Sequence, residues 1–220
     1  MKPLAKSKLF NRSKKRNLIA HSFPESKISE EFRKIRTNVH FVTNEQKHKI
    51  VLITSPNTGE GKSTTAANLA VSMSQQNEKV LLIDANLRKP STHFIFNVTN
   101  SVGLTDVLTG KTTLNEAVID SEIGSLEVLP SGKLPNNPAE LLSSPMMKEL
   151  LQEAAKEYDS VIIDSSSVLE VTDTKILASL CDGVLLVLYK GNTQLEKAAE
   201  AKKVLEFSKA KISGVILNEM

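Results

Sequence analysis

Residues 49–65 read KIVLITSPNTGEGKSTT, and this stretch decides the fold. Its apolar part, Ile50 to Ile53, has the length and branching of a buried strand. A segment rich in Ser, Pro, Asn and Gly follows, and Lys62-Ser63 then begins a helical pattern that runs to about Gln75. A strand, a glycine-containing turn and a Lys-Ser pair at a helix start form the context of a phosphate-binding P-loop.

The predicted P-loop supplies the groups that hold nucleotide phosphates. Backbone N–H groups in the loop and at the helix N-terminus favour an anion. Lys62 adds a positive charge for the β- and γ-phosphates, and the Ser63 hydroxyl can bind Mg²⁺. The general pattern starts with Gly where this chain has Pro56, so an ordinary strand-to-helix turn is the alternative. We expect a nucleotide to contact these consecutive residues: Thr58, Gly59, Glu60, Gly61, Lys62, Ser63 and Thr64.

Two other apolar runs each end in an aspartate. Residues 80–83 precede Asp84, and residues 161–163 precede Asp164. In an open parallel sheet, ligands bind at the carboxyl ends of the strands. Asp164 fits a Walker B carboxylate, which holds Mg²⁺ directly or through water, while Asp84 can accept a proton or make a second metal contact. Arg88, shortly after Asp84, can pair with a phosphate.

The remaining patterns indicate the fold class. Further apolar runs predict strands at residues 126–129, 184–188 and 211–217, and helical patterns occupy residues 138–142, 145–156 and 194–207. Strands that alternate with helices favour a parallel sheet with helices on both faces. We therefore expect an α/β fold of the P-loop NTPase type.

Composition divides the chain into a basic tail and a mildly acidic body. Residues 1–16 hold seven Lys or Arg and no acid, which leaves 21 basic against 25 acidic residues elsewhere. We expect a flexible tail over residues 1–21 and a single domain over residues 22–220. The tail is either merely solvated or attracted to an anionic membrane surface or an acidic partner. No motif in the sequence supports nucleic-acid binding. No apolar run is long enough to span a bilayer. The single cysteine cannot form an internal disulfide, which favours a reducing cytoplasm.

An amphipathic helix is expected over Ser22 to Thr43. One stripe of it is apolar and consists of Ile28, Phe32, Ile35, Val39 and Val42. Glu30, Arg33 and Arg36 lie on a neighbouring face, three residues apart. They form either a solvated face with internal Glu30–Arg33 pairing or a surface that pairs with another subunit.

Together these segments resemble the bacterial tyrosine kinases (BY-kinases) of polysaccharide export systems, from about Ser26 to Asn218. Four segments carry the resemblance. They are a Glu-x-x-Arg-x-x-Arg-Thr-Asn motif at residues 30–38, a Walker A at residues 55–64, a Walker A′ at residues 82–90, and a loop with its following helix at residues 129–142. Partition and septum-site ATPases share the fold, but they carry a signature Lys at the second position of the Walker A motif. This chain has Asn57 at that position.

The resemblance implies an ATP- and Mg²⁺-dependent protein-tyrosine kinase that regulates exopolysaccharide or capsule synthesis and export. Its catalytic groups are then Lys62, Asp84 and Asp164, its metal contacts are Ser63, Asp84 and Asp164, and Asn218 contacts adenine. Glu30, Arg33 and Arg36 would join subunits into a homo-oligomer, such as a ring. The implied partners are substrate proteins that bear tyrosine and a membrane-bound activator, which would place a cytoplasmic chain at the inner face of the cell membrane.

Three departures from the family pattern leave a second reading open. Asn86 replaces a second Asp, Ser165–Ser167 stand where prolines usually follow the Walker B Asp, and no tyrosine cluster precedes Met220. Either the sequence is truncated or the kinase phosphorylates other proteins. The rival function is a nucleotide-switched P-loop ATPase that controls assembly of a membrane export complex without productive tyrosine phosphorylation, and a plain ATPase is a third.

Overall fold

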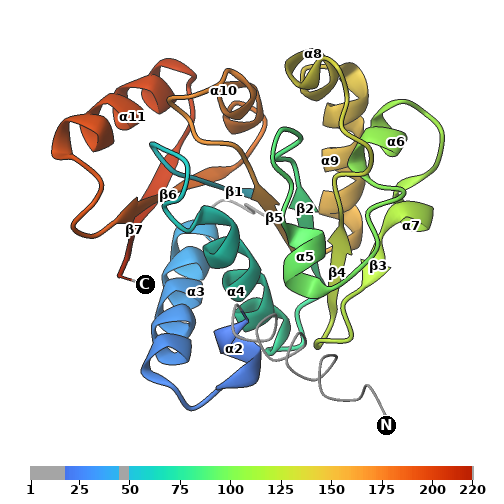
Figure 1. Cartoon of the computed structure of the whole chain (residues 1–220). Helices are drawn as coiled ribbons and strands as arrows, with labels where there is room; N and C mark the ends of the chain where they lie inside the picture. Colours follow the sequence, from blue (N-terminus) through green and yellow to red (C-terminus); the bar gives the residue numbers. More distant parts are fainter. Residues whose placement is uncertain (1–17, 45–49, 220) are drawn as a thin grey trace, which may run out of the picture.

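The computed structural model describes residues 18–44 and 50–219 (Figure 1). Its centre is a seven-stranded sheet in the order β3-β4-β2-β5-β1-β6-β7. The strands are β1 (Ile50–Thr54), β2 (Val80–Asp84), β3 (Ile119–Asp120), β4 (Leu126–Leu129), β5 (Ser160–Asp164), β6 (Gly183–Tyr189) and β7 (Ile212–Asn218). Neighbouring strands pair in parallel, except for the antiparallel pair of β3 and β4. The predicted parallel α/β sheet is confirmed.

Helices cover both faces of the sheet (Figure 1). They are α2 (Ile19–Ser22), α3 (Lys27–Asn44), α4 (Lys62–Ser74), α5 (Thr92–Phe96), α6 (Leu104–Leu108), α7 (Leu114–Ala117), α8 (Pro138–Leu142), α9 (Pro145–Glu157), α10 (Asp173–Ala178) and α11 (Leu195–Phe207). None of the described helices is long and apolar enough to cross a membrane.

Two apolar clusters, one on each face, form the core. Ile50 and Leu52 of β1 belong to the cluster that also contains residues of α9, α10 and α11. Val51 and Ile53 belong to the other cluster, together with residues of α3 and α4. Successive residues of a strand point to opposite faces, so a strand in the middle of a two-sided sheet must be apolar throughout. That requirement explains the uninterrupted apolar run before the P-loop.

The N-terminal part differs from the prediction in where its helices begin. The long helix α3 starts at Lys27 rather than Ser22, and a separate turn of helix, α2, precedes it. Ala20 is buried, its N–H donates to Asn68 Oδ1 at 2.9 Å, and its carbonyl accepts from Gln75 Nε2 at 3.0 Å. Residues 18–21, which were predicted to belong to the flexible tail, therefore lie in a segment that packs on α4, while residues 1–17 of that predicted tail lie outside the described part of the chain.

Candidate functional site

The carboxyl ends of β1, β2 and β5 meet beside the P-loop (Figure 1). Strand β5 pairs with β1 on one side and with β2 on the other. The register places Asp164 next to Ile53 of β1 and opposite Asp84 of β2. The two predicted aspartates therefore end adjacent strands at the mouth of the phosphate loop, as expected for a sheet of this type.

The phosphate loop needs glycine at two positions. Gly59 and Gly61 have φ values of +85° and +86°, in the left-handed region where side chains are strained. Helix α4 starts directly after Gly61, so its N-terminal N–H groups border the loop. A Cβ atom on Gly61 would lie 2.2 Å from Asn218 Nδ2, so glycine there also makes room for the end of β7.

Glu60 stabilises the loop from inside. Its side chain is buried, with Oε2 accepting from the Asn57 N–H at 2.9 Å and Oε1 accepting from Thr193 Oγ1 at 2.5 Å. Its carbonyl oxygen accepts from Asn218 Nδ2 at 3.1 Å. We predicted Glu60 among the nucleotide contacts, but its carboxylate is engaged within the protein. Buried carboxylates need such donors, and here they fix the shape of the loop.

A cavity of about 240 Å³ lies in front of the loop, and we call it the phosphate pocket. It brings together four residues predicted to bind the nucleotide with several that sequence reasoning did not assign. Its lining consists of Thr58, Lys62, Ser63, Asn86, Arg88, Lys89, Ser91, Ser166, Ser167, Glu170 and Val171. Cations and hydroxyl groups dominate this lining, which is the chemistry that a polyphosphate requires.

Asp164 is a fully buried carboxylate, and neither of its oxygens has a hydrogen-bond partner among the described residues. Burial, followed by the charge of Asp84, raises its pKa to about 7, while Lys62 and the Ser63 hydroxyl act in the opposite direction. Such a group is costly to leave unpaired, and a divalent cation would satisfy it.

The donor set around Asp164 fits Mg²⁺. Asp164, Asp84 and the Ser63 hydroxyl are the oxygen ligands that this ion prefers. The described residues contain no group of three or more His, Cys, Asp and Glu side chains placed to hold a metal on their own. The ion would thus take its other ligands from phosphates and water, as is usual for Mg²⁺ with nucleotides.

Asp84 is also buried, but donors surround it. Its Oδ2 accepts from Thr92 Oγ1 at 2.7 Å, from the Ser91 N–H at 2.9 Å and from the Thr92 N–H at 3.0 Å. Burial raises the pKa of Asp84, and these hydrogen bonds partly offset that rise. The start of α5 therefore fixes the orientation of this carboxylate. Nothing in the sequence around Thr92 signalled that role, because the contact depends on how the chain turns after β2.

Arg88 lines the phosphate pocket and is paired with a buried acid. Its Nε and Nη2 donate to the two carboxylate oxygens of Asp173 at 2.8 and 3.1 Å. Asp173 is fully buried at the start of α10 and was not singled out from the sequence. The predicted contact of Arg88 with phosphate stays a prediction, since this two-bond geometry already uses one edge of the guanidinium.

Two departures from the family pattern contact each other. Ser166 Oγ donates to Asn86 Oδ1 at 2.9 Å, and the Lys89 N–H donates to the same oxygen at 3.2 Å. Both side chains are buried beside the phosphate pocket. The amide oxygen of Asn86 is thus used inside the protein, so a neutral side chain held by two hydrogen bonds stands where a second carboxylate was expected.

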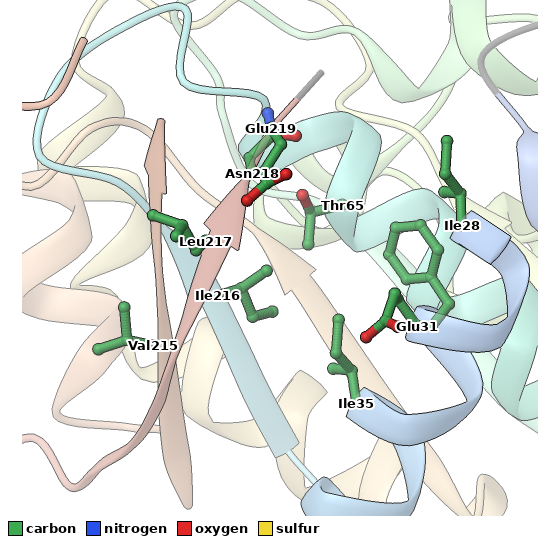
Figure 2. A pocket seen from close by; sticks show the side chains of 10 residues that line it. Ile28, Glu31, Ile35, Thr65, Val215, Ile216, Leu217, Asn218 and Glu219 are labelled. Atoms are coloured by element: carbon green, nitrogen blue, oxygen red, sulfur yellow. The ribbon is translucent and has the colours of Figure 1, made fainter. Parts of the chain in front are cut away.

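A larger cavity of about 720 Å³ opens beside the end of β7 (Figure 2). Figure 2 shows Ile28, Glu31 and Ile35 of α3 on one side and Ile216 and Asn218 of β7 on the other. Most of its lining is apolar, and its polar lining residues are Glu31, Thr65, Asn218 and Glu219. Since Asn218 also contacts the phosphate loop, this cavity adjoins the loop at the side away from the aspartates.

The charged face predicted on α3 is only partly exposed. Arg33 Nε donates to Glu30 Oε2 at 2.7 Å on the surface, which is the internal pairing considered from the sequence. Arg36, however, is only 6% exposed, and its Nη1 donates to the Ser72 carbonyl oxygen of α4. Arg36 therefore does not share an exposed surface with Glu30 and Arg33, because this long side chain satisfies a carbonyl near the end of a neighbouring helix. Its predicted role in joining subunits stays a prediction.

Comparison with known proteins agrees with this geometry. An AAA domain family matches residues 48–210. Tyrosine-protein kinase YwqD of Bacillus subtilis (strain 168) is 52% identical over 203 residues, which are 92% of this chain and 86% of that protein.

Solved structures support the same assignment. The kinase domain of Escherichia coli tyrosine kinase ETK superposes with a TM-score of 0.89 at 33% identity, covering 92% of this chain and 80% of that one. The septum site-determining protein MinD of Pyrococcus horikoshii, complexed with Mg-ADP, gives a TM-score of 0.67 at 25% identity over 77% of this chain and 70% of that one. The fit is thus closer to the kinase than to the septum-site protein, and the chain belongs to the family of bacterial tyrosine-protein kinases.

Proposed function

We propose that this family member is an ATP- and Mg²⁺-dependent kinase that phosphorylates tyrosines of other proteins and thereby regulates exopolysaccharide or capsule synthesis and export. The observation that carries the proposal is the pair Asp84 and Asp164, buried side by side next to Lys62 and the phosphate loop. Donors orient Asp84, whereas Asp164 has no hydrogen-bond partner within the described ranges by distance and angle and is influenced by Lys62 and the Ser63 hydroxyl, so the two environments suit different tasks.

In this proposal the phosphates bind to the loop amides and Lys62, and the adenine base lies in the larger cavity near Asn218. Asp84, whose pKa is raised by burial, accepts the proton of the attacking tyrosine hydroxyl while Thr92 fixes its orientation. Ser63 and Asp164, with Asp84 as a second contact, would hold Mg²⁺. When bound, that ion neutralises charge on the transferred phosphoryl group.

We also propose the setting in which the kinase works, and the family resemblance supports it. A membrane-bound activator would bring the cytoplasmic chain to the inner face of the membrane. Glu30, which is exposed, and Arg33, which is half-buried, would exchange their internal pairing on α3 for contacts with a neighbouring subunit in a homo-oligomer. Residues 22–220 would then act as one kinase domain.

One observation favours the rival function, an ATPase that switches assembly of an export complex. Asn86 has no charge, and its oxygen is occupied by Ser166 and the Lys89 N–H, so the pocket has one carboxylate fewer than the family pattern implies. A pocket with fewer carboxylates binds Mg²⁺ more weakly or has a weaker base. Such a protein would still bind nucleotide but would not transfer its phosphoryl group.

The test is transfer of phosphate to tyrosine. We would incubate the full chain with Mg²⁺, ATP, the cytoplasmic segment of the activator and a tyrosine-bearing substrate protein, and detect phosphotyrosine by mass spectrometry. We expect phosphotyrosine with wild type and with Lys148→Met, an exposed site on α9, and none with Lys62→Met. ATP hydrolysis without phosphotyrosine would support the rival function, and turnover by Lys62→Met equal to wild type would remove the P-loop assignment.

A further inference from the structure

A carboxylate from outside the recognised motifs bonds to the phosphate loop. Glu170 lies between β5 and α10, and its Oε1 accepts from the Thr58 N–H at 2.7 Å while its Oε2 accepts from Thr58 Oγ1 at 2.7 Å. Both oxygens of one carboxylate are therefore bound to one residue of the loop. Charge-assisted bonds of this length and number are stronger than bonds between neutral groups.

The rest of the segment after β5 leads Glu170 to this position. The Val168 N–H donates to the Ser55 carbonyl at 2.9 Å, and the Leu169 N–H donates to the Pro56 carbonyl at 3.4 Å. The segment therefore runs along the start of the phosphate loop, and Glu170 makes the last contact of the series. We call this contact, Glu170 with Thr58, the acidic strap.

The acidic strap places a negative charge at the phosphate pocket. Glu170 lines that pocket together with Lys62 and Lys89. The bonds to Thr58 and the two lysine charges hold the pKa of Glu170 below its usual range, so the carboxylate is ionised at neutral pH. It is exposed, so nucleotide can approach it and salt can screen it.

We propose that Glu170 is an affinity-determining residue: its strap weakens the binding of nucleotide phosphates and so lowers the affinity of this chain for ATP. The inference rests on the proposed nucleotide binding. A triphosphate brings several negative charges into a pocket that Glu170 already supplies with one, and like charges at this range repel. The Glu170 carboxylate also interacts with the positive charges of Lys62 and Lys89. It therefore partly neutralises the charges that would attract the phosphates.

The repulsion predicts a graded dependence on phosphate charge. Replacing Glu170 by Gln removes the charge and keeps the shape, so ATP should bind about three- to tenfold more tightly. ADP should gain less than ATP, and adenosine should gain nothing. Thr58→Val removes one of the two bonds that hold the strap, so it should tighten ATP binding by a smaller factor.

The experiment is isothermal titration of the full chain with Mg-ATP, Mg-ADP and adenosine at low and high salt. The variants are Glu170→Gln, Thr58→Val and the control Glu149→Gln, an exposed glutamate on α9 that does not line the phosphate pocket. We expect the control to match wild type and the gain of Glu170→Gln to shrink at high salt.

The proposal is overturned if Glu170→Gln binds ATP no more tightly than wild type. It is also overturned if adenosine gains as much as ATP, because the effect would then be one of loop shape and not of charge. If wild type binds ATP and the variants match it, only the strap is refuted. If wild type binds no ATP at all, the proposed function fails as well.

Discussion

Replacing Asp164 by Asn should make the nucleotide-free protein more stable and the kinase inactive. The carboxylate is fully buried and lacks a hydrogen-bond partner among the described residues. Asparagine has nearly the same shape and carries no charge. The variant therefore removes the destabilising ionisation without opening a cavity, but it also removes the oxygen that would hold Mg²⁺.

The size of the gain follows from the pKa. A rise from 3.8 to about 7 makes ionisation of Asp164 in the folded protein unfavourable, by roughly 4 kcal/mol. A buried amide without partners still costs about 1–2 kcal/mol, so the net gain at pH 8 should be roughly 2–4 kcal/mol.

The gain should depend on pH with a defined sign. The folded protein keeps the Asp164 proton up to about pH 7, whereas the unfolded chain releases it near its ordinary pKa of 3.8. Between these values the folded state binds more protons, so this group makes wild-type stability fall as pH rises. Above the folded pKa the loss is complete. Asp164→Asn lacks this pH dependence. The gain in its free energy of unfolding over wild type should therefore be larger at pH 8 than at pH 5.

Urea denaturation at pH 5 and pH 8, without Mg²⁺ or nucleotide, measures both quantities. Asp120→Asn, at the exposed end of β3, is the matched control and should change stability little. A variant less stable than wild type at pH 8, or an equal gain at both pH values, would refute the reasoning. Retention of Mg²⁺-dependent activity would refute the metal assignment of Asp164.

Three further outcomes are expected. Arg36→Ala should lower the free energy of unfolding by about 1–3 kcal/mol, because it leaves a buried carbonyl unpaired. Arg33→Ala should change it by less than about 1 kcal/mol. Equal losses of the two variants in thermal melts would contradict this. Thr92→Val should raise the pKa of Asp84 further and shift the acidic limb of the pH–activity profile upward; an unmoved profile would count against Asp84 as the base. Gly61→Ala should abolish nucleotide binding in titrations while secondary structure by circular dichroism is kept, because its φ and the neighbouring strand exclude a side chain.

The sequence predicted the elements whose signal is local. Strands β2, β4 and β5 were predicted with the bounds observed, because each is a short run of mainly apolar residues that stops at an Asp or before a Pro. Strand β3 was missed because a strand of two residues at the sheet edge buries too little to leave a pattern. Helix α10 was missed because six residues are too few to show a helical period.

The candidate site divides in the same way. Lys62, Asp84 and Asp164 could be predicted because each stands at a fixed place in a strand or turn. Glu170 and Thr92 could not, because their partners depend on how the segments after β5 and β2 fold back. No period or spacing encodes such contacts between loops, and only the assembled sheet edge brings them together.

The strand order has a consequence for how the chain is made. Within this sheet β1 leaves the ribosome before the other strands, yet its two neighbours, β5 and β6, begin only at Ser160 and Gly183. At the usual speed of synthesis, roughly 5–20 s pass between the synthesis of β1 and that of its first partner strand, β5. During that time its apolar run is an unpaired edge, able to join other nascent chains. Strands β2 and β4 emerge earlier as neighbours and can pair while β1 waits. The segment that builds the nucleotide site is therefore also the strand of this sheet that stays longest without a partner during synthesis.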